Sequence, residues 1–195
     1  MALTRRDIVK GFASAVPASV ALNMLGTRFA FAQAADFAND VEVLNYALTL
    51  EYLESDFYTK AAKQVKGLSS YENKLTAELR DNELAHVDAL TAKIKDLGGK
   101  PAAKPMFAYG KAFASRASYL KLANTLEDTG VSAYNGAAPQ IKDKKLLAAA
   151  GTIVQIEGRH AALIRFKRGM EIAPNAFDEA LERDEVLRAV DPFVV

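Results

Sequence analysis

Two glutamate–histidine pairs have the residue types and the spacing of a metal site. The chain has two histidines, and each follows a glutamate by three positions, in Glu83-Leu-Ala-His86 and Glu157-Gly-Arg-His160. Residues three apart lie on one face of an α-helix, so each pair can direct a carboxylate and an imidazole at one point. Because the chain has no cysteine, any metal must be held by oxygen and nitrogen donors. The pattern predicts a dinuclear metal centre.

Two more glutamates lie on apolar helix faces. Glu51 follows Leu44 and Leu48, and Glu127 has an equivalent place after Leu120. A buried carboxylate must be protonated, paired or bound to a metal, and no lysine or arginine shares these faces in register with the four acids. One Glu from each of two helices, with Glu-x-x-His from two others, is the donor set of di-iron and di-manganese bundles. The predicted ligands are Glu51, Glu83, His86, Glu127, Glu157 and His160.

Three side chains are candidates for the surroundings of this centre. Tyr58 and Tyr134 stand two turns beyond the glutamates of their helices, so we expect them either to hydrogen-bond the ligand carboxylates or to be ordinary core tyrosines. Glu54 is a rival to Glu51 as first ligand. However, it points about 300° further round the helix, and Gly130 stands at the equivalent place in the other half. We therefore expect Glu54 at the surface or outside the ligand set.

The elements that must position these residues are helices. Apolar residues recur at steps of three and four over residues 36–65, 71–97, 115–138 and 143–170. The segment 98–112 is rich in proline and glycine and long enough to cross a bundle from end to end. The sequence of the tail, residues 171–195, predicts a short helix near 177–190. The fold class is therefore all-α, a four-helix bundle with a long crossover and a short C-terminal helix.

The N-terminal segment has the pattern of an export signal. Arg5-Arg6 precede an apolar stretch over residues 11–25, and small residues follow at Ala32-Gln33-Ala34. This predicts a twin-arginine signal peptide over residues 1–34 and one domain over 35–195, periplasmic or otherwise exported. The apolar stretch is short against the roughly 20 residues of a membrane span, so no stable span is expected after cleavage.

Composition restricts the class of partner. The chain has 195 residues, is 50% hydrophobic and carries a formal net charge of +1, which suits one domain with a sizeable core. Nothing in it forms the basic patch that nucleic-acid binding requires. The sequence therefore predicts no nucleic-acid partner.

The order of the six ligands resembles that of the ferritin-like superfamily, which includes bacterioferritin, rubrerythrin and manganese catalase. Residues 44–58, 127–134 and Asp191-Pro192-Phe193 look most like exported ferritin-like domain proteins grouped with plant desiccation-related proteins. The resemblance covers about residues 36–195. It implies two iron or two manganese ions bridged by Glu83 and Glu157, with Glu51 and Glu127 as terminal ligands and one histidine on each metal.

The same resemblance implies three alternative functions. A di-iron centre would oxidise ferrous ion or a small reductant with dioxygen or peroxide, in envelope stress or iron handling. A manganese pair would disproportionate peroxide as manganese catalase does. A non-catalytic protein would use the metals to hold its helices together and bind a partner under stress or desiccation. Because there is no cysteine for a rubredoxin-type iron centre, the electron donor of an oxidase must be another molecule. A homo-oligomer is compatible with each alternative.

Overall fold

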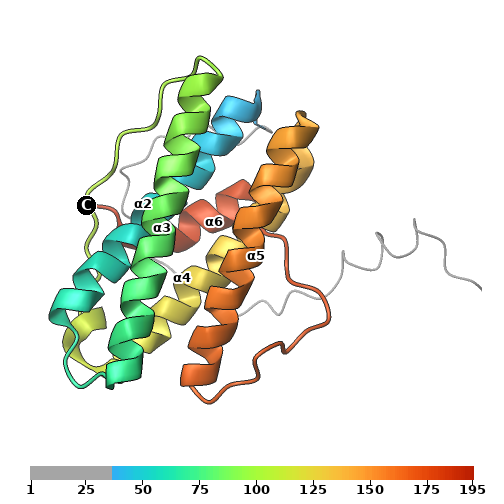
Figure 1. Cartoon of the computed structure of the whole chain (residues 1–195). Coiled ribbons are helices and arrows are strands. Elements are labelled where there is room, and N and C mark those ends of the chain that lie inside the picture. Colours follow the sequence, from blue (N-terminus) through green and yellow to red (C-terminus); the bar gives the residue numbers. More distant parts are fainter. Residues whose placement is uncertain (1–36) are drawn as a thin grey trace, which may run out of the picture. The chain divides into compact units, whose positions relative to one another are not determined.

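Four long helices make up most of the described chain. The computed structural model describes residues 37–195, and Figure 1 shows the long helices running beside one another. Helix α2 packs on α3, α4 packs on α5, and α2 also contacts α4. The expected all-α bundle is confirmed, whereas the expected signal peptide lies outside the described residues. The bounds are α2 Asp40–Gln64, α3 Ser70–Asp96, α4 Arg116–Ala137 and α5 Lys144–Lys167.

The helix ends follow local side-chain chemistry. Ser69 caps α3, since its hydroxyl accepts from the backbone N–H of Glu72 while the Glu72 carboxylate accepts from the backbone N–H of Ser69. These bonds satisfy donors that the first turn of a helix leaves free. Gly98 follows α3 with a φ of 74°, a conformation that glycine adopts at little cost. Asp143 caps α5 by accepting from the backbone N–H groups of two residues of its first turn.

The crossover between α3 and α4 is held by the C-terminus. Phe107 and Val194 form an isolated antiparallel bridge, and the backbone N–H of Ala108 donates to the carbonyl oxygen of Phe193 at 2.8 Å. Tyr109, also in the crossover, donates its hydroxyl to the backbone oxygen of Leu53 on α2 at 2.8 Å. The crossover is therefore bonded both to the C-terminal residues and, through Tyr109, to α2.

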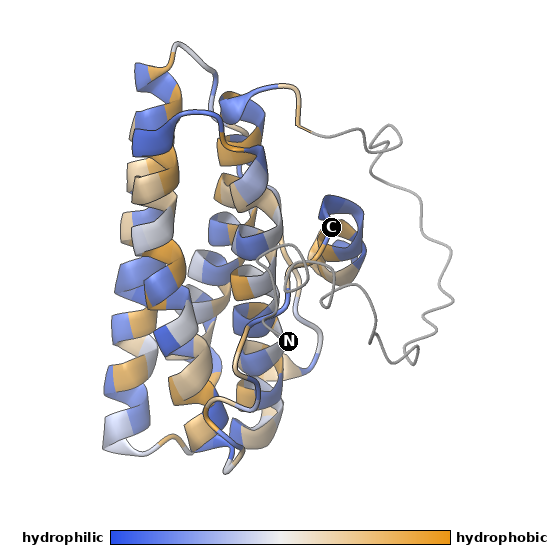
Figure 2. Cartoon of the chain, turned by 90° about the vertical axis from the view of Figure 1, so that its right-hand side faces the viewer, coloured by the Kyte–Doolittle hydropathy of each residue, from blue (hydrophilic) through white to orange (hydrophobic). Residues whose placement is uncertain are grey.

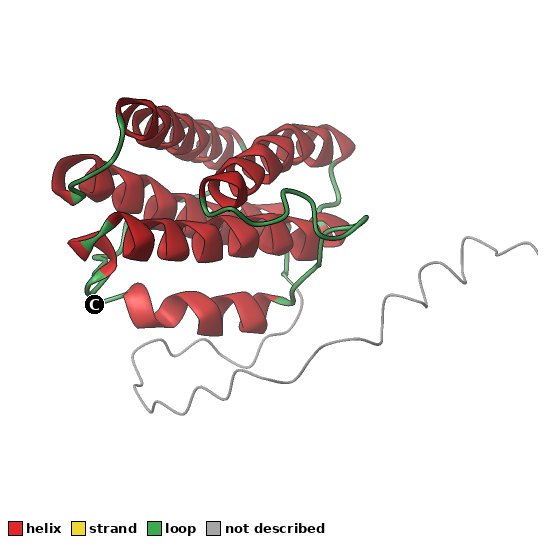
Figure 3. Cartoon of the chain, turned by 90° about the horizontal axis from the view of Figure 1, so that it is seen from below, coloured by secondary structure: helices red, strands yellow, loops and turns green. Residues whose placement is uncertain are grey.

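The short C-terminal helix starts later than the sequence pattern indicated. Helix α6 covers Arg183–Val190 rather than starting near residue 177, and the Glu185 carboxylate accepts from the backbone N–H of Glu182, the cap of its first turn. Before this cap, the backbone N–H of Leu181 donates to the carbonyl oxygen of Ser132 on α4. Figure 3 shows α6 lying along the outside of the four long helices, and it buries Val186 completely.

Acidic side chains interrupt the hydrophobic core. Along α2, Leu48 belongs to one apolar cluster and Phe57 and Tyr58 belong to another, with Glu51 between them. Figure 2 shows hydrophilic and hydrophobic residues interspersed along each long helix. No helix within residues 37–195 is long and apolar enough to cross a membrane. The bundle therefore carries its polar cluster inside, beside two apolar clusters.

Candidate metal centre

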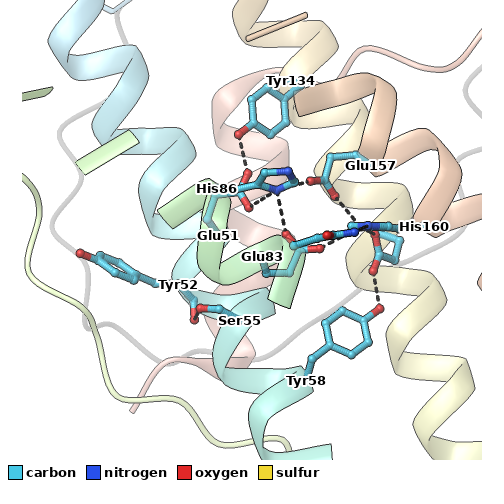
Figure 4. Close-up of polar contacts among 11 residues, drawn as sticks. Glu51, Tyr52, Ser55, Tyr58, Glu83, His86, Tyr134, Glu157 and His160 are labelled. Carbon is cyan, nitrogen blue, oxygen red and sulfur yellow. Dashed lines mark hydrogen bonds and ion pairs between the residues drawn. The ribbon is translucent and has the colours of Figure 1, made fainter. Parts of the chain in front are cut away.

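Each of the four long helices contributes an acid to one buried cluster. Glu51 comes from α2, Glu127 from α4, and the two Glu-x-x-His pairs come from α3 and α5. All four glutamates have an exposed fraction of 0%, and Figure 4 shows the labelled glutamate and histidine side chains converging between the helices. The ligand atoms fall into two groups that share two glutamates. These groups are Glu51, Glu83, His86 and Glu157, and Glu83, Glu127, Glu157 and His160.

The two shared glutamates each direct one oxygen at each histidine. Glu83 Oε2 lies 3.1 Å from Nδ1 of His86, and its Oε1 lies 2.8 Å from Nδ1 of His160. Glu157 Oε1 lies 3.0 Å from Nδ1 of His86, and its Oε2 lies 3.6 Å from Nδ1 of His160. This is the placement that two carboxylates need to bridge a pair of metal ions.

The remaining two glutamates face one histidine each. Glu51 Oε2 lies 3.2 Å from Nδ1 of His86, and Glu127 Oε2 lies 3.6 Å from Nδ1 of His160. The two imidazole rings have centroids 6.3 Å apart. Each half of the cluster thus offers one imidazole, one carboxylate of its own and two shared carboxylates.

Two tyrosines cross the bundle to hold the unshared carboxylates. Tyr58 on α2 donates its hydroxyl to Oε1 of Glu127 on α4. Tyr134 on α4 donates to Oε1 of Glu51 on α2. Both contacts leave the Oε2 atoms of these glutamates directed at the histidines. Such outer hydrogen bonds fix the orientation of carboxylate ligands.

Several polar atoms at the middle of the cluster meet the neighbouring charged side chains only as ion pairs and make no hydrogen bond of good geometry. They are Oε1 of Glu83, Oε2 of Glu127, both oxygens of Glu157 and Nδ1 of His160. A buried polar atom without a partner costs about 1–3 kcal/mol, whereas a cation placed among these atoms would satisfy them together. Carboxylate and imidazole donors suit manganese and iron. The residues therefore fit a pair of such ions.

Without a metal, the cluster balances its charge with protons. Burial disfavours the imidazolium form of His86, but its close contacts with the carboxylates of Glu157, Glu51 and Glu83 outweigh this effect and raise its pKa to about 12. The pKa of His160 is also raised, against its burial, by its contacts with Glu127, Glu157 and Glu83. Both imidazoles are therefore cationic at neutral pH, a form that cannot bind a metal.

The pKa values of the carboxyl groups differ according to burial and to the charged side chains beside each group. Burial would raise the pKa of Glu83, but its close approach to His160 and His86 lowers it to about 2. Burial raises the pKa of Glu127 to about 8, although His160 opposes the change. Burial, followed by the charge of Glu157, also raises the pKa of Glu51 well above its usual range. Only part of the acid cluster is therefore ionised before a metal binds.

Two residues extend what the sequence indicated. Glu54 was expected either at the surface or outside the ligand set, and it takes the second of these places. Glu54 is not at the surface, since its exposed fraction is 3%; it lies opposite Gly130 of α4, where the missing side chain leaves room for its carboxylate. Asn82 was not among the candidates, yet its amide lies 3.1 Å from Nε2 of His160. The only sequence signal for Asn82 was its position directly before Glu83. The corresponding position of α5, directly before Glu157, holds the apolar Ile156.

The fold and the cluster define an all-α bundle with buried carboxylate and histidine side chains that could hold metal. The sequence matches the model of a family described as ferritin-like domain over residues 39–169. The chain therefore belongs to the ferritin-like domain family, and the resemblance noted in the sequence is confirmed.

A solved structure with a similar fold supports the same architecture. A conserved hypothetical protein from Mycobacterium tuberculosis superposes with a TM-score of 0.58 and 18% sequence identity. The similarity covers 69% of this chain and 94% of that chain. At this identity, the likeness shows the fold alone. A search of curated proteins found no match.

Proposed function

We propose that the chain is an exported dimetal protein whose six ligands are those predicted, and that it oxidises ferrous ion or a small reductant with dioxygen or peroxide. The observation that carries the proposal is the pair of shared glutamates. Glu83 and Glu157 each present one oxygen to each histidine, so two ions would be held in adjacent positions. Two adjacent iron ions can supply electrons to one oxidant molecule.

The protein groups have separate tasks in this proposal. Glu83 and Glu157 would each contribute to both metal positions, and His86 and His160 would each contribute to one of them. Tyr58 and Tyr134 fix the two unshared carboxylates through their hydroxyl groups. The burial of all four ligand glutamates excludes water from the centre and strengthens its electrostatic interactions.

Oxygen consumption by reloaded protein tests the oxidase directly. Metal-free protein is loaded with two equivalents of ferrous ion without oxygen and then mixed with oxygenated buffer. The wild-type chain should oxidise iron faster than ferrous ion in the same buffer, whereas Glu157→Gln should match the buffer. Glu78→Gln is a suitable control, since this residue is exposed on α3. Wild-type protein that binds two iron ions without oxidation or peroxide turnover would refute the oxidase.

Elemental analysis of protein from its own host identifies the metal. Two iron ions per chain support the oxidase, and two manganese ions with catalase activity support the manganese alternative. The donor set accepts both metals. Near-absence of metal in folded protein would favour the non-catalytic binding role.

Export is the remaining part of the proposal. The Arg5-Arg6 pair and the small residues before position 35 support it. Replacing both arginines by lysine should retain full-length protein in the cytoplasm, while the unchanged chain is recovered, shortened, from the exported fraction. Equal distribution of the two forms would contradict a twin-arginine address.

A further inference from the structure

An apolar cavity lies between the four long helices, and the proposed metal centre makes no use of it. Its lining side chains come from α2, α3, α4 and α5, and among these described residues none carries a charge. Short side chains leave the space, because many of the lining residues are alanines. These are Ala47, Ala133, Ala137, Ala138 and Ala150.

The cavity adjoins the half of the centre that contains Glu51 and His86. Ala47 lies one turn before Glu51 on α2, and Leu90 lies one turn after His86 on α3. Tyr134 forms part of the cavity wall and donates its hydroxyl to the Glu51 carboxylate, a contact that Figure 4 shows. The cavity and the predicted ligand set are therefore joined through this tyrosine.

The size of the cavity restricts what can occupy it. Its volume is about 20 Å³, against about 150 Å³ for a cavity that holds benzene. An organic reductant is therefore too large, whereas a molecule of two heavy atoms fits.

The polarity of the lining selects among small molecules. A buried water needs roughly two to four polar partners. The Tyr134 hydroxyl is already bonded to Glu51, so among the lining side chains only the hydroxyl of Tyr46 is left to bond a guest. Peroxide would likewise leave O–H groups unpaired, which costs free energy in an apolar site. Dioxygen has no such groups and gains by leaving water.

We propose that this cavity binds dioxygen and supplies it to the half of the centre that contains Glu51 and His86. The inference rests on the function proposed above and makes dioxygen, rather than peroxide, the oxidant. Ala138 and Ile141 line the cavity at the connection between α4 and α5, where both are only half-buried. Dioxygen enters from this connection and moves towards Tyr134, which is buried.

Methyl relaxation in the metal-free protein tests the binding site without any metal chemistry. Dioxygen is paramagnetic, so a bound molecule speeds the relaxation of nearby methyl protons. The rates are measured by NMR under dioxygen and under dinitrogen at the same pressure. Dioxygen should raise the rates of Ala133 and Leu90 severalfold more than those of Ala123 and Leu79, which are similarly buried but do not line the cavity. Equal increases in the two pairs overturn the binding site.

Filling the cavity tests whether it supplies the reaction. Ala137→Val adds two carbon atoms to the lining, and Ala148→Val makes the same change at an exposed position of α5. The dioxygen concentration for half-maximal oxidation of ferrous ion should rise about 4–15-fold in Ala137→Val, the enrichment expected for a molecule comparable to one or two methylene groups. It should stay at the wild-type value in Ala148→Val. A wild-type value in Ala137→Val, in folded protein that binds two manganese ions, overturns the supply role.

The two measurements separate this inference from the proposed function. Oxidation of iron by dioxygen without selective methyl relaxation overturns the cavity site and leaves the oxidase standing. Selective relaxation in a protein that does not oxidise iron overturns the oxidase and the supply role, while dioxygen binding stands. If Ala137→Val does not fold, the relaxation of the wild-type methyl groups still decides whether the cavity binds dioxygen.

Discussion

Metal binding should release protons from the cluster, which makes its affinity strongly dependent on pH. In the metal-free protein, the pKa of His86 is raised to about 12 and that of His160 is raised as well. Both imidazoles must lose a proton before a ring nitrogen can bind a metal. Glu127, with a pKa of about 8, is also largely protonated at neutral pH, and burial raises the pKa of Glu51 in the same direction. The expected release is about two to four protons for each metal pair.

The size of the effect follows from linkage. Each released proton changes the binding constant tenfold per pH unit, which equals about 1.36 kcal/mol. With at least two protons, the overall constant for binding two manganese ions should rise by at least about 100-fold between pH 6 and pH 7. The affinity rises with pH because protons compete with the metal for the same side chains.

Calorimetry can count these protons. The heat of manganese binding is measured at one pH in two buffers with different ionisation enthalpies, and the difference gives the number released. His160→Gln should release about one proton fewer, since glutamine carries no titratable group. Release of less than about one proton, with affinity that changes less than about tenfold per pH unit, would refute the charge distribution described for the metal-free cluster.

Three further changes test other parts of the structure. Metal-free protein should lose thermal stability as the pH rises from about 5 to 8. Folding raises the pKa of Glu127 from 4.5 to about 8. The contribution of Glu127 to folding stability is therefore fully present below pH 4.5 and is lost as the pH rises through 8. An unchanged melting temperature in the presence of chelator would contradict this. Tyr58→Phe should weaken manganese binding about 10–100-fold in direct titration, because its hydroxyl no longer orients the Glu127 carboxylate; wild-type affinity would make the tyrosine a packing residue. Gly136→Ala should destabilise the bundle by about 1–3 kcal/mol in denaturant unfolding, since its Cβ would lie 1.9 Å from the carbonyl oxygen of Leu181. Gly151→Ala, with no heavy atom within 4 Å of the new Cβ, should instead be neutral or stabilising by up to about 1 kcal/mol, and equal losses in both variants would contradict the close approach.

The helices were predictable because their signals are local. Apolar periodicity, the Ser69 cap and the glycine after α3 act within a few residues, so the bounds of the long helices follow closely from the sequence. The first residue of α6 could not be predicted as closely from the sequence. It depends on the contact of Leu181 with Ser132, which joins segments far apart in the chain.

The convergence of six donors could be anticipated from their repeated order, but the state of Glu54 could not. Helical geometry places Glu54 about 300° round from Glu51, a direction that is exposed or buried according to the neighbouring helix. Gly130 on α4 decides the outcome by leaving room for the carboxylate.

The sequence by itself determined the helices, the spacing of Glu83 with His86 and of Glu157 with His160, and the lack of thiolate donors, since all of these are set within single segments. Only the tertiary structure decided which oxygen faces which histidine, which tyrosine holds which carboxylate, and that Glu54 is buried. These features depend on the packing of α2 on α3, of α4 on α5 and of α2 against α4. Side chains from separate helices acquire common neighbours only when the helices pack.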